Sequence, residues 1–122
     1  MKIFKLKYSQ KLPISLNEAW DFLSSPKNLE LITPRHMDFN ITDWDEKKAY
    51  PGQIIQYTVK PLLGVKINWV TEITQVKDKE FFIDEQRFGP YSFWHHKHFL
   101  KEVENGILIE DVIHYKLSLI HI

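Results

Sequence analysis

Apolar and polar residues alternate along most of segment 89–117, which Asn105-Gly106 divides near its middle. Such alternation is typical of β-strands with one buried face, and an Asn-Gly pair between two alternating runs favours a hairpin with a two-residue turn. We therefore predict one β-hairpin in this segment. If the turn consists of those two residues, Glu104 pairs with Ile107.

The same alternation divides the side chains of the predicted hairpin between two faces of a sheet. One face carries Trp94, His96, His98 and Leu100 from the first strand, and Ile109, Asp111, Ile113, Tyr115 and Leu117 from the second. The predicted turn sets Leu100 opposite Asp111, His98 opposite Ile113 and His96 opposite Tyr115. The other face carries most of the charged side chains, so we expect it to meet solvent. Because imidazole, phenol, indole and carboxylate groups lie among aliphatic ones, the first face suits a pocket with polar spots better than a dry core.

The chain begins with a pattern for one strand and one helix. Residues 2–12 alternate apolar residues with lysines, which predicts a strand with one buried face. Ser15 and Glu18 then form a capping-box pattern, in which the hydroxyl and the carboxylate each accept a hydrogen bond from a free amide of the first helical turn. Apolar residues follow at helical spacing, so a short helix is predicted here.

A second short helix and a further strand follow. Ser25 is predicted as the N-cap of this helix, Pro26 occupies its first helical position, and Thr33-Pro34 closes it. Apolar and polar residues then alternate over 37–42, which predicts a strand.

From residue 53 onward the pattern predicts strands alone. Segments 53–60 and 65–76 form a hairpin around a turn at 61–64, and 80–87 forms another strand. The order of elements is therefore one strand, two helices and about six antiparallel strands, which indicates an α+β fold.

The face of segment 80–87 that points inward depends on the following loop. A three-residue loop at 89–91 would align Asp84 with His96, whereas a loop with an even number of residues would bring Ile83 and Glu85 inward. The sequence leaves both possibilities open.

Length, composition and charge exclude several classes of protein. The 122 residues are enough for one domain with a real core, which we assign to 1–122. The formal net charge is zero, so no basic surface supports nucleic-acid binding. Without cysteine the chain has neither disulfides nor thiolate ligands. No apolar run approaches the length of a membrane span and no signal peptide precedes the first strand, so we expect a cytoplasmic protein without stable membrane insertion.

Several segments together resemble one known superfamily. They are LPISLNEAWDFLSSPKNLELITPRHMDF at residues 12–39, Gly89-Pro90, Trp94-x-His96-x-His98, and Gly106 leading to Asp111-x-Ile113-x-Tyr115. In this combination the chain resembles the START-like helix-grip superfamily (SRPBCC), which includes polyketide cyclases/dehydrases and lipid-transport proteins, and it looks closest to small bacterial single-domain members. The resemblance implies that a curved, seven-stranded antiparallel sheet grips a long C-terminal helix, with a hydrophobic cavity between them.

The sequence departs from this pattern at its end. After Tyr115 the family pattern continues into the gripping helix, whereas this sequence stops at LSLIHI, so we expect a domain that is truncated at its C-terminus relative to the family. Uncovered Trp94, Ile109, Ile113 and Leu117 would then form an exposed apolar patch of the kind that drives association. We therefore expect self-association, either as a homodimer through the open sheet face or by strand exchange.

The two histidines of the first hairpin strand raise two chemical possibilities. His96 and His98, with Asp111 and, if the loop allows, Asp84, could chelate a first-row metal. His-x-His alone is a weak signal and the resembling family is generally free of metal, so we expect histidines that hydrogen-bond to Tyr115, to Asp111 or to water, with no metal and no cofactor.

Asp111 is the residue with the clearest chemical consequence. A carboxylate on an inward face must be paired or must change its pKa, because ionised groups lose solvation when they are buried. Paired with His98 it would form an acid/base couple able to enolise a ketone or remove water from a bound polyketide. A structural network that fixes strand register is the alternative, and we favour it.

The predicted function is the binding of a hydrophobic or amphipathic small molecule, such as a lipid, a polyketide or a quinone. Trp69, Trp94 and Tyr115 would stack on the ligand or serve as core, two roles that aromatic residues fill equally well. The full set of predicted ligand-binding residues is Trp69, Asp84, Trp94, His96, His98, Asp111 and Tyr115. Two alternatives are a cyclase or dehydratase that uses His98 and Asp111, and a protein-interaction module.

Overall fold

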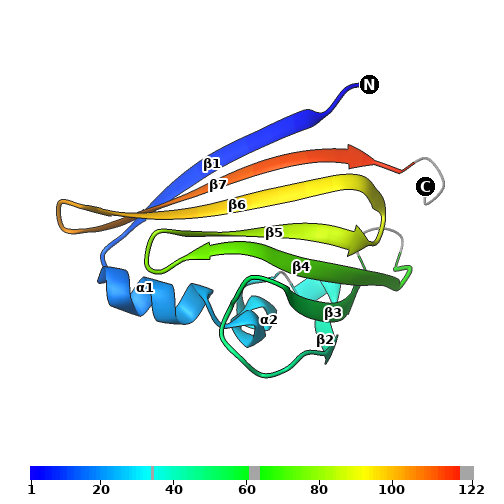
Figure 1. Ribbon diagram of the computed structural model, residues 1–122, viewed down its shortest axis with the longest axis horizontal. Helices are drawn as coiled ribbons and strands as arrows, with labels where there is room; N and C mark the ends of the chain where they lie inside the picture. The colour runs from blue at the N-terminus through cyan, green and yellow to red at the C-terminus, as the bar shows by residue number, and fades with distance from the viewer. Residues whose placement is uncertain (34, 61–63, 119–122) are drawn as a thin grey trace.

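Seven antiparallel strands form one curved sheet in the computed structural model, which describes residues 1–33, 35–60 and 64–118 (Figure 1). The strands are β1 (Phe4–Leu12), β2 (Asn40–Asp43), β3 (Gln53–Val59), β4 (Ile67–Lys77), β5 (Phe81–Phe88), β6 (Tyr91–Val103) and β7 (Gly106–Leu117). Their order across the sheet is β1-β7-β6-β5-β4-β3-β2, so the first strand pairs with the last. The predicted α+β helix-grip sheet, with two short helical segments after its first strand, is confirmed.

Helix α1 (Leu16–Leu23) begins as its sequence predicts. The amide of Glu18 donates to Oγ of Ser15 at 3.1 Å, and the Glu18 carboxylate accepts from the Ser15 amide at 3.4 Å. These reciprocal bonds satisfy two amides that a helix leaves free in its first turn. Ala19 and Trp20 are buried, and the Trp20 ring meets the edge of Phe82 on the sheet. The helix therefore packs its apolar stripe onto the core.

The second helical segment is shorter and less regular than predicted. A 3-10 turn, η1 (Pro26–Asn28), leads into one turn of α-helix, α2 (Leu29–Ile32). Pro26 takes the first helical position as predicted, but the side chain of Ser25 makes no capping hydrogen bond. Thr33 caps the end of α2, and Pro34 lies outside the described residues.

The predicted strand at 37–42 begins three residues too early. Met37 belongs to a second 3-10 turn, η2 (Arg35–Met37), and β2 begins only at Asn40. Asp38 adopts a positive φ of 47°, a conformation that aspartate tolerates better than most residues and that ends the turn before the strand begins. Strands β3, β4 and β5 agree with the predicted segments, whereas residues 61–63 of the predicted turn lie outside the described part of the chain.

The β6–β7 hairpin is confirmed, but its predicted register is wrong by two residues. Val103 pairs with Gly106, so the turn consists of Glu104 and Asn105, and Asn105 has the positive φ of 62°. Gly106 instead begins β7, where an added Cβ would lie 2.1 Å from the carbonyl oxygen of Leu12 on β1. Glycine is therefore needed here for a close approach between strands.

The corrected register changes the partners but not the faces. Across β6 and β7 the pairs are Trp94 with Tyr115, His96 with Ile113, His98 with Asp111, and Leu100 with Ile109. A shift of two residues leaves every side chain on its predicted face, because side chains alternate with a period of two. The inward face thus carries the predicted residues with different neighbours.

Helices α1 and α2 lie on one side of the sheet and leave β1 on the far edge uncovered (Figure 1). On β1 the side chains of Phe4, Leu6 and Tyr8 are 46%, 49% and 50% exposed, and Leu117 at the end of β7 is 53% exposed. These four residues are called the open stripe below. Within the described residues no helix follows β7, as predicted. None of the helices in this part of the chain is long and apolar enough to cross a membrane.

The predicted exposed patch is wrong in its membership. Ile113 is only 5% exposed, because Leu6 on β1 and His96 on β6 flank it across the sheet. Trp94 and Ile109 are partly buried, so of the four predicted residues only Leu117 is exposed. The pairing of β1 with β7 explains the difference, since it moves the uncovered apolar side chains to β1.

Candidate functional site

A pocket of about 770 Å³ lies between the inner face of the sheet and the helical segments that precede β2. Its apolar wall includes Leu29 of α2, Met37 of η2, Ile55 of β3 and Phe82 of β5. Strand β6 contributes Trp94, His96 and His98, the alternate residues of the inward face. No lysine or arginine is among the described residues that line it. The charged groups of the wall are thus confined to one place on β5 and β6.

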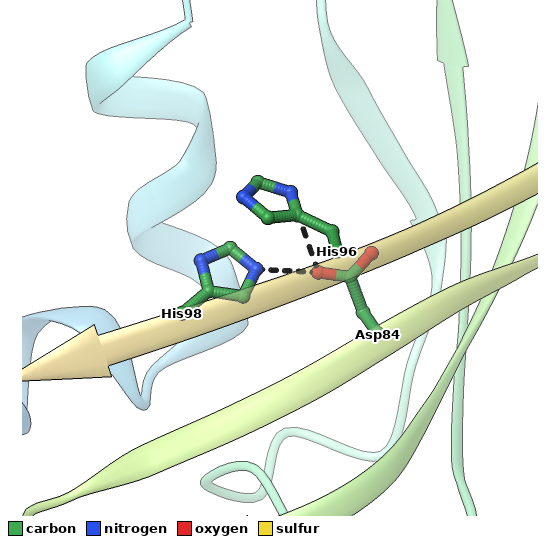
Figure 2. Close-up of side chains that lie close together, drawn as sticks. All are labelled: Asp84, His96 and His98. Atoms are coloured by element: carbon green, nitrogen blue, oxygen red, sulfur yellow. Dashed lines mark hydrogen bonds and ion pairs between the residues drawn. The ribbon is translucent and has the colours of Figure 1, made fainter. Parts of the chain in front are cut away.

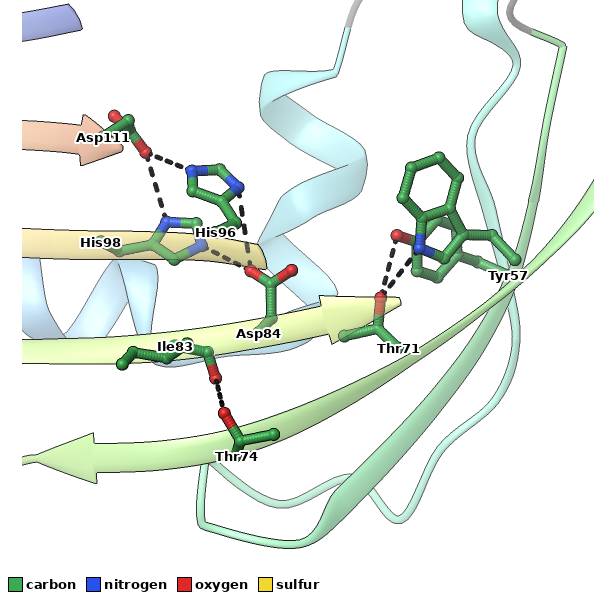
Figure 3. Close-up of polar contacts among 9 residues, drawn as sticks. Tyr57, Thr71, Thr74, Ile83, Asp84, His96, His98 and Asp111 are labelled. Atoms are coloured by element: carbon green, nitrogen blue, oxygen red, sulfur yellow. Dashed lines mark hydrogen bonds and ion pairs between the residues drawn. The ribbon is translucent and has the colours of Figure 1, made fainter. Parts of the chain in front are cut away.

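Two histidines and two aspartates form a closed cluster at this place (Figure 3). Nε2 of His98 lies 2.6 Å from Oδ2 of Asp84, and Nε2 of His96 lies 2.8 Å from Oδ1 of Asp111. The remaining two distances are longer, 3.4 Å from His98 Nδ1 to Asp111 and 3.8 Å from His96 Nδ1 to Asp84. All four side chains are between 12% and 15% exposed. We call these residues the His/Asp cluster.

Both faces of the His98 ring are covered. Its plane stacks on Phe82 at 4.0 Å between ring centroids and on His96 at 3.6 Å, and two rings this close must lie on opposite faces. Both ring nitrogens face carboxylates of the cluster. A bound molecule therefore meets the edge of the cluster and not the nitrogens of His98.

The cluster shifts the pKa of two of its members. Burial alone would lower the pKa of His98, but hydrogen bonds to Asp111 and Asp84 and the charges of both carboxylates raise it to about 9. For Asp111, burial would raise the pKa, yet hydrogen bonds from His96 and His98 hold it well below its usual range. His98 is therefore an imidazolium at neutral pH and Asp111 is a carboxylate.

A wall of aromatic rings adjoins the cluster. The rings of Trp69 and Trp94 meet at right angles with centroids 5.3 Å apart, and Tyr91 packs against both. Nε1 of Trp69 donates to Oγ1 of Thr71 at 3.1 Å, and the Tyr57 hydroxyl lies 3.2 Å from the same oxygen (Figure 3). Burial raises the pKa of Tyr57, so its hydroxyl stays protonated. The polar atoms of this wall are thus largely satisfied among themselves.

Five of the predicted ligand-binding residues line the pocket: Trp69, Asp84, Trp94, His96 and His98. The open question about β5 is answered, since Asp84 pairs with His96 and points inward. Asp111 stands behind the histidines and is not among the lining residues. Tyr115 also lies outside the lining. Its ring stacks on that of Phe4 on the edge strand β1, with 5.8 Å between the ring centroids.

Sequence reasoning missed the contributions of Tyr57, Thr71 and Phe82 to the site. Tyr57 pairs with Trp69 across β3 and β4, and Phe82 pairs with His98 across β5 and β6. Alternation within each strand could have placed these residues on the inner face. Only the register between strands brings them against the named site residues.

Asp84, His96 and His98 also hold ligand-type atoms within 4.8 Å of one another (Figure 2). The two imidazoles are stacked with planes 23° apart, so their in-plane lone pairs run side by side instead of converging on one point. His98 Nε2 is moreover committed to Asp84 at 2.6 Å. The arrangement suits shared protons better than a coordinated metal ion.

Comparisons with known proteins give a fold and no closer relative. No protein-family model matches the sequence, and no curated protein matches it. Solved structures do match. Protein CV1439 from Chromobacterium violaceum superposes with a TM-score of 0.77 at 13% identity, covering 93% of this chain and 81% of that one. Ginseng major latex-like protein 151 from Panax ginseng gives 0.72 at 11% identity, with 94% and 80% covered. Ara h 8.0201 gives 0.68 at 11% identity, with 96% and 79% covered.

These solved structures have the Bet v 1-like helix-grip fold. The chain therefore has the helix-grip fold that its sequence resembles. At 11% to 13% identity the likeness is one of fold, so the function must be argued from the pocket itself.

Proposed function

We propose that this helix-grip chain binds a hydrophobic or amphipathic small molecule in the pocket between its sheet and its helical segments. The observation that carries the proposal is a pocket of about 770 Å³ with an apolar and aromatic wall and one localised group of polar atoms. Ligand sites in proteins have this character, in which burial of apolar surface supplies affinity and a few polar groups fix orientation. A lipid, a polyketide or a quinone-like molecule would fit this description.

Affinity would come mainly from the aromatic wall. Burial contributes about 25 cal/mol per Å² of apolar surface, before the cost of ordering the ligand is subtracted. Trp69 and Trp94 offer large rigid faces at the pocket and lose little entropy on binding, because their rings already hold each other in place.

Native mass spectrometry of the freshly purified protein tests the proposal directly. We expect an organic molecule of a few hundred daltons to be retained with the chain, and solvent extraction to release it for identification. A protein that carries no such mass, and that binds none of a panel of lipids, quinones and polyketide mimics by calorimetry, would contradict the proposal.

Catalysis through His98 and Asp111 is less well supported. His98 is covered on both ring faces and its nitrogens face carboxylates, so it has no free position for a reacting substrate. Asp111 is separated from the pocket by the histidines. We therefore place binding ahead of a cyclase or dehydratase activity, and we assign the cluster a positioning role.

The open stripe supports a further part of the proposal, the association of two copies of the chain. Three neighbouring apolar side chains on one edge strand, each about half exposed, form a surface that water disfavours. Pairing of two such stripes would bury them without a new element of structure.

A further inference from the structure

The head group that the pocket accepts can be inferred from its polar atoms. Three members of the His/Asp cluster line the pocket, but only two have polar atoms left for a ligand, because both ring nitrogens of His98 face carboxylates. The two are Asp84 and His96. Their hydrogen-bonding state therefore decides which chemical group fits.

Asp84 offers a free acceptor. Its Oδ2 receives the bond from His98, whereas the other oxygen, Oδ1, points away from both histidines (Figure 2). Among the described residues no hydrogen bond reaches Oδ1, although the side chain is only 14% exposed and lines the pocket. A carboxylate oxygen in this position favours a donor, since a mostly buried polar atom without a hydrogen bond is costly.

His96 is already bonded to the carboxylate behind it. Its Nε2 must donate to Asp111, because an ionised carboxylate can only accept. Its Nδ1 lies 3.8 Å from Asp84, too far for a hydrogen bond to that carboxylate. Asp84 Oδ1 is thus the acceptor that the polar end of the pocket offers to a ligand.

The rest of the described wall gives an anion no lysine or arginine to pair with, and the N–H of Trp69 is committed to Thr71. A bound carboxylate would face Asp84, and the imidazolium of His98 has no N–H left for it, because both ring nitrogens face Asp84 and Asp111. A cation, in contrast, would meet Asp84 together with the faces of aromatic rings, which attract ammonium groups.

We propose that the pocket selects apolar ligands that carry a protonated amine, with the ammonium group donating to Asp84 Oδ1, and that it rejects the corresponding carboxylates. The inference rests on the proposed function, since it specifies the ligand class of the same pocket. A neutral alcohol, which can donate one hydrogen bond but carries no charge, should bind with intermediate affinity.

Calorimetric titration with three ligands of one chain length tests this selectivity. Decylamine, decan-1-ol and decanoate share the same apolar body, and each is used at pH 7 below the concentration at which it aggregates. We expect decylamine to bind at least tenfold more tightly than decanoate. If decan-1-ol binds while decanoate matches or exceeds decylamine, the selectivity for amines is wrong and the proposed function survives. If all three fail to bind, the proposed function fails, and this inference fails with it.

Two variants connect the selectivity to its residue. Asp84→Asn keeps an oxygen for the His98 bond and removes the charge, so it should lower the preference for decylamine over decanoate at least fivefold and leave decan-1-ol nearly unchanged. Glu85→Gln is the matched control, because its side chain lies next in sequence on the opposite face of β5 and pairs with Arg87. A preference that persists in Asp84→Asn would overturn the assignment to this carboxylate. Should Asp84→Asn not fold, the comparison of the three ligands on the unmodified protein decides the proposal.

Discussion

His98 bonds to Asp84 at 2.6 Å, although the strand register sets His98 beside Phe82 and Asp84 beside His96. The bond therefore runs diagonally from β6 to β5. The bond of His96 is diagonal as well, since it reaches Asp111, the residue opposite His98 on β7. Two diagonal bonds thus hold three strands in one register: a slip of β5 would break the bond to Asp84, and a slip of β7 would break the bond to Asp111.

The first prediction concerns the pH dependence of stability. The pKa of His98 is raised from 6.5 to about 9 by its carboxylate partners, so its stabilising effect is complete below pH 6.5 and is lost as pH rises from 6.5 to 9. The shift corresponds to roughly 3 kcal/mol. Urea denaturation should show a fall in the free energy of unfolding of this order between pH 6 and pH 9.5.

Asp111 sets the opposite limit. Its pKa is lowered on folding from an ordinary value of 3.8, so its contribution is present above that value and is lost as pH falls below it. The stability of the cluster should therefore be greatest between about pH 4 and pH 6.5. His98→Gln should remove most of the alkaline decline, whereas His36→Gln, at an exposed position on η2, should retain it. An unchanged decline in His98→Gln would assign it to other groups.

The second prediction tests the pocket wall. Trp94→Ala removes a ring that packs against Trp69 and lines the pocket, so ligand affinity should fall by tenfold to a hundredfold, or about 1.4 to 2.8 kcal/mol. Phe93→Ala is its control, since this neighbouring side chain is 41% exposed on the outer face of β6. Calorimetry with the retained ligand measures both. Equal losses in the two variants would mean that the pocket is not the binding site.

How much of this structure follows from the sequence depends on which relationship is considered. Alternation within a strand decides which side chains share a face, and it placed Trp94, His96 and His98 inward correctly. Pairing between strands depends on the turn. The Asn105-Gly106 pair gave the wrong register, because Gly106 lies in β7, where the close approach of the Leu12 backbone requires glycine, and not in the turn. Since an error of two residues keeps the faces, the pocket could be predicted although its bonds could not.

The bonding partners of the histidines were beyond reach for the same reason. The sequence suggested a couple of His98 with Asp111, whereas the short bonds are those of His98 with Asp84 and of His96 with Asp111. Asp84 could not be assigned without the length of the loop before β6, and the diagonal choice depends on side-chain rotamers that no pattern encodes.

The third prediction uses the glycine that decides the hairpin register. Gly106→Ala would place a Cβ 2.1 Å from the Leu12 carbonyl oxygen, a backbone atom that cannot move away without displacing β1 from β7. The free energy of unfolding should fall by about 2 kcal/mol or more. Asn105→Gly is the comparison, because φ is already positive at Asn105 and glycine adopts it without strain, so stability should change by less than about 0.5 kcal/mol. If Asn105→Gly instead destabilised the protein more than Gly106→Ala, the turn would have to lie at Asn105-Gly106, as first predicted.

The last prediction concerns the open stripe. Leu6 is 49% exposed in the middle of β1, between Phe4 and Tyr8, and its partner on β7 is the buried Ile113. If two copies associate through this surface, Leu6→Glu should place two carboxylates in the interface and weaken the dimer at least tenfold in sedimentation velocity over a dilution series. Lys7→Glu, on the opposite face of the same strand, introduces the same carboxylate outside the interface, with a charge change larger by one unit. It should leave association intact, because Lys7 only forms an exposed ion pair with Glu110 there. If the unmodified protein is monomeric at every concentration, the proposal that two copies associate through the open stripe is wrong.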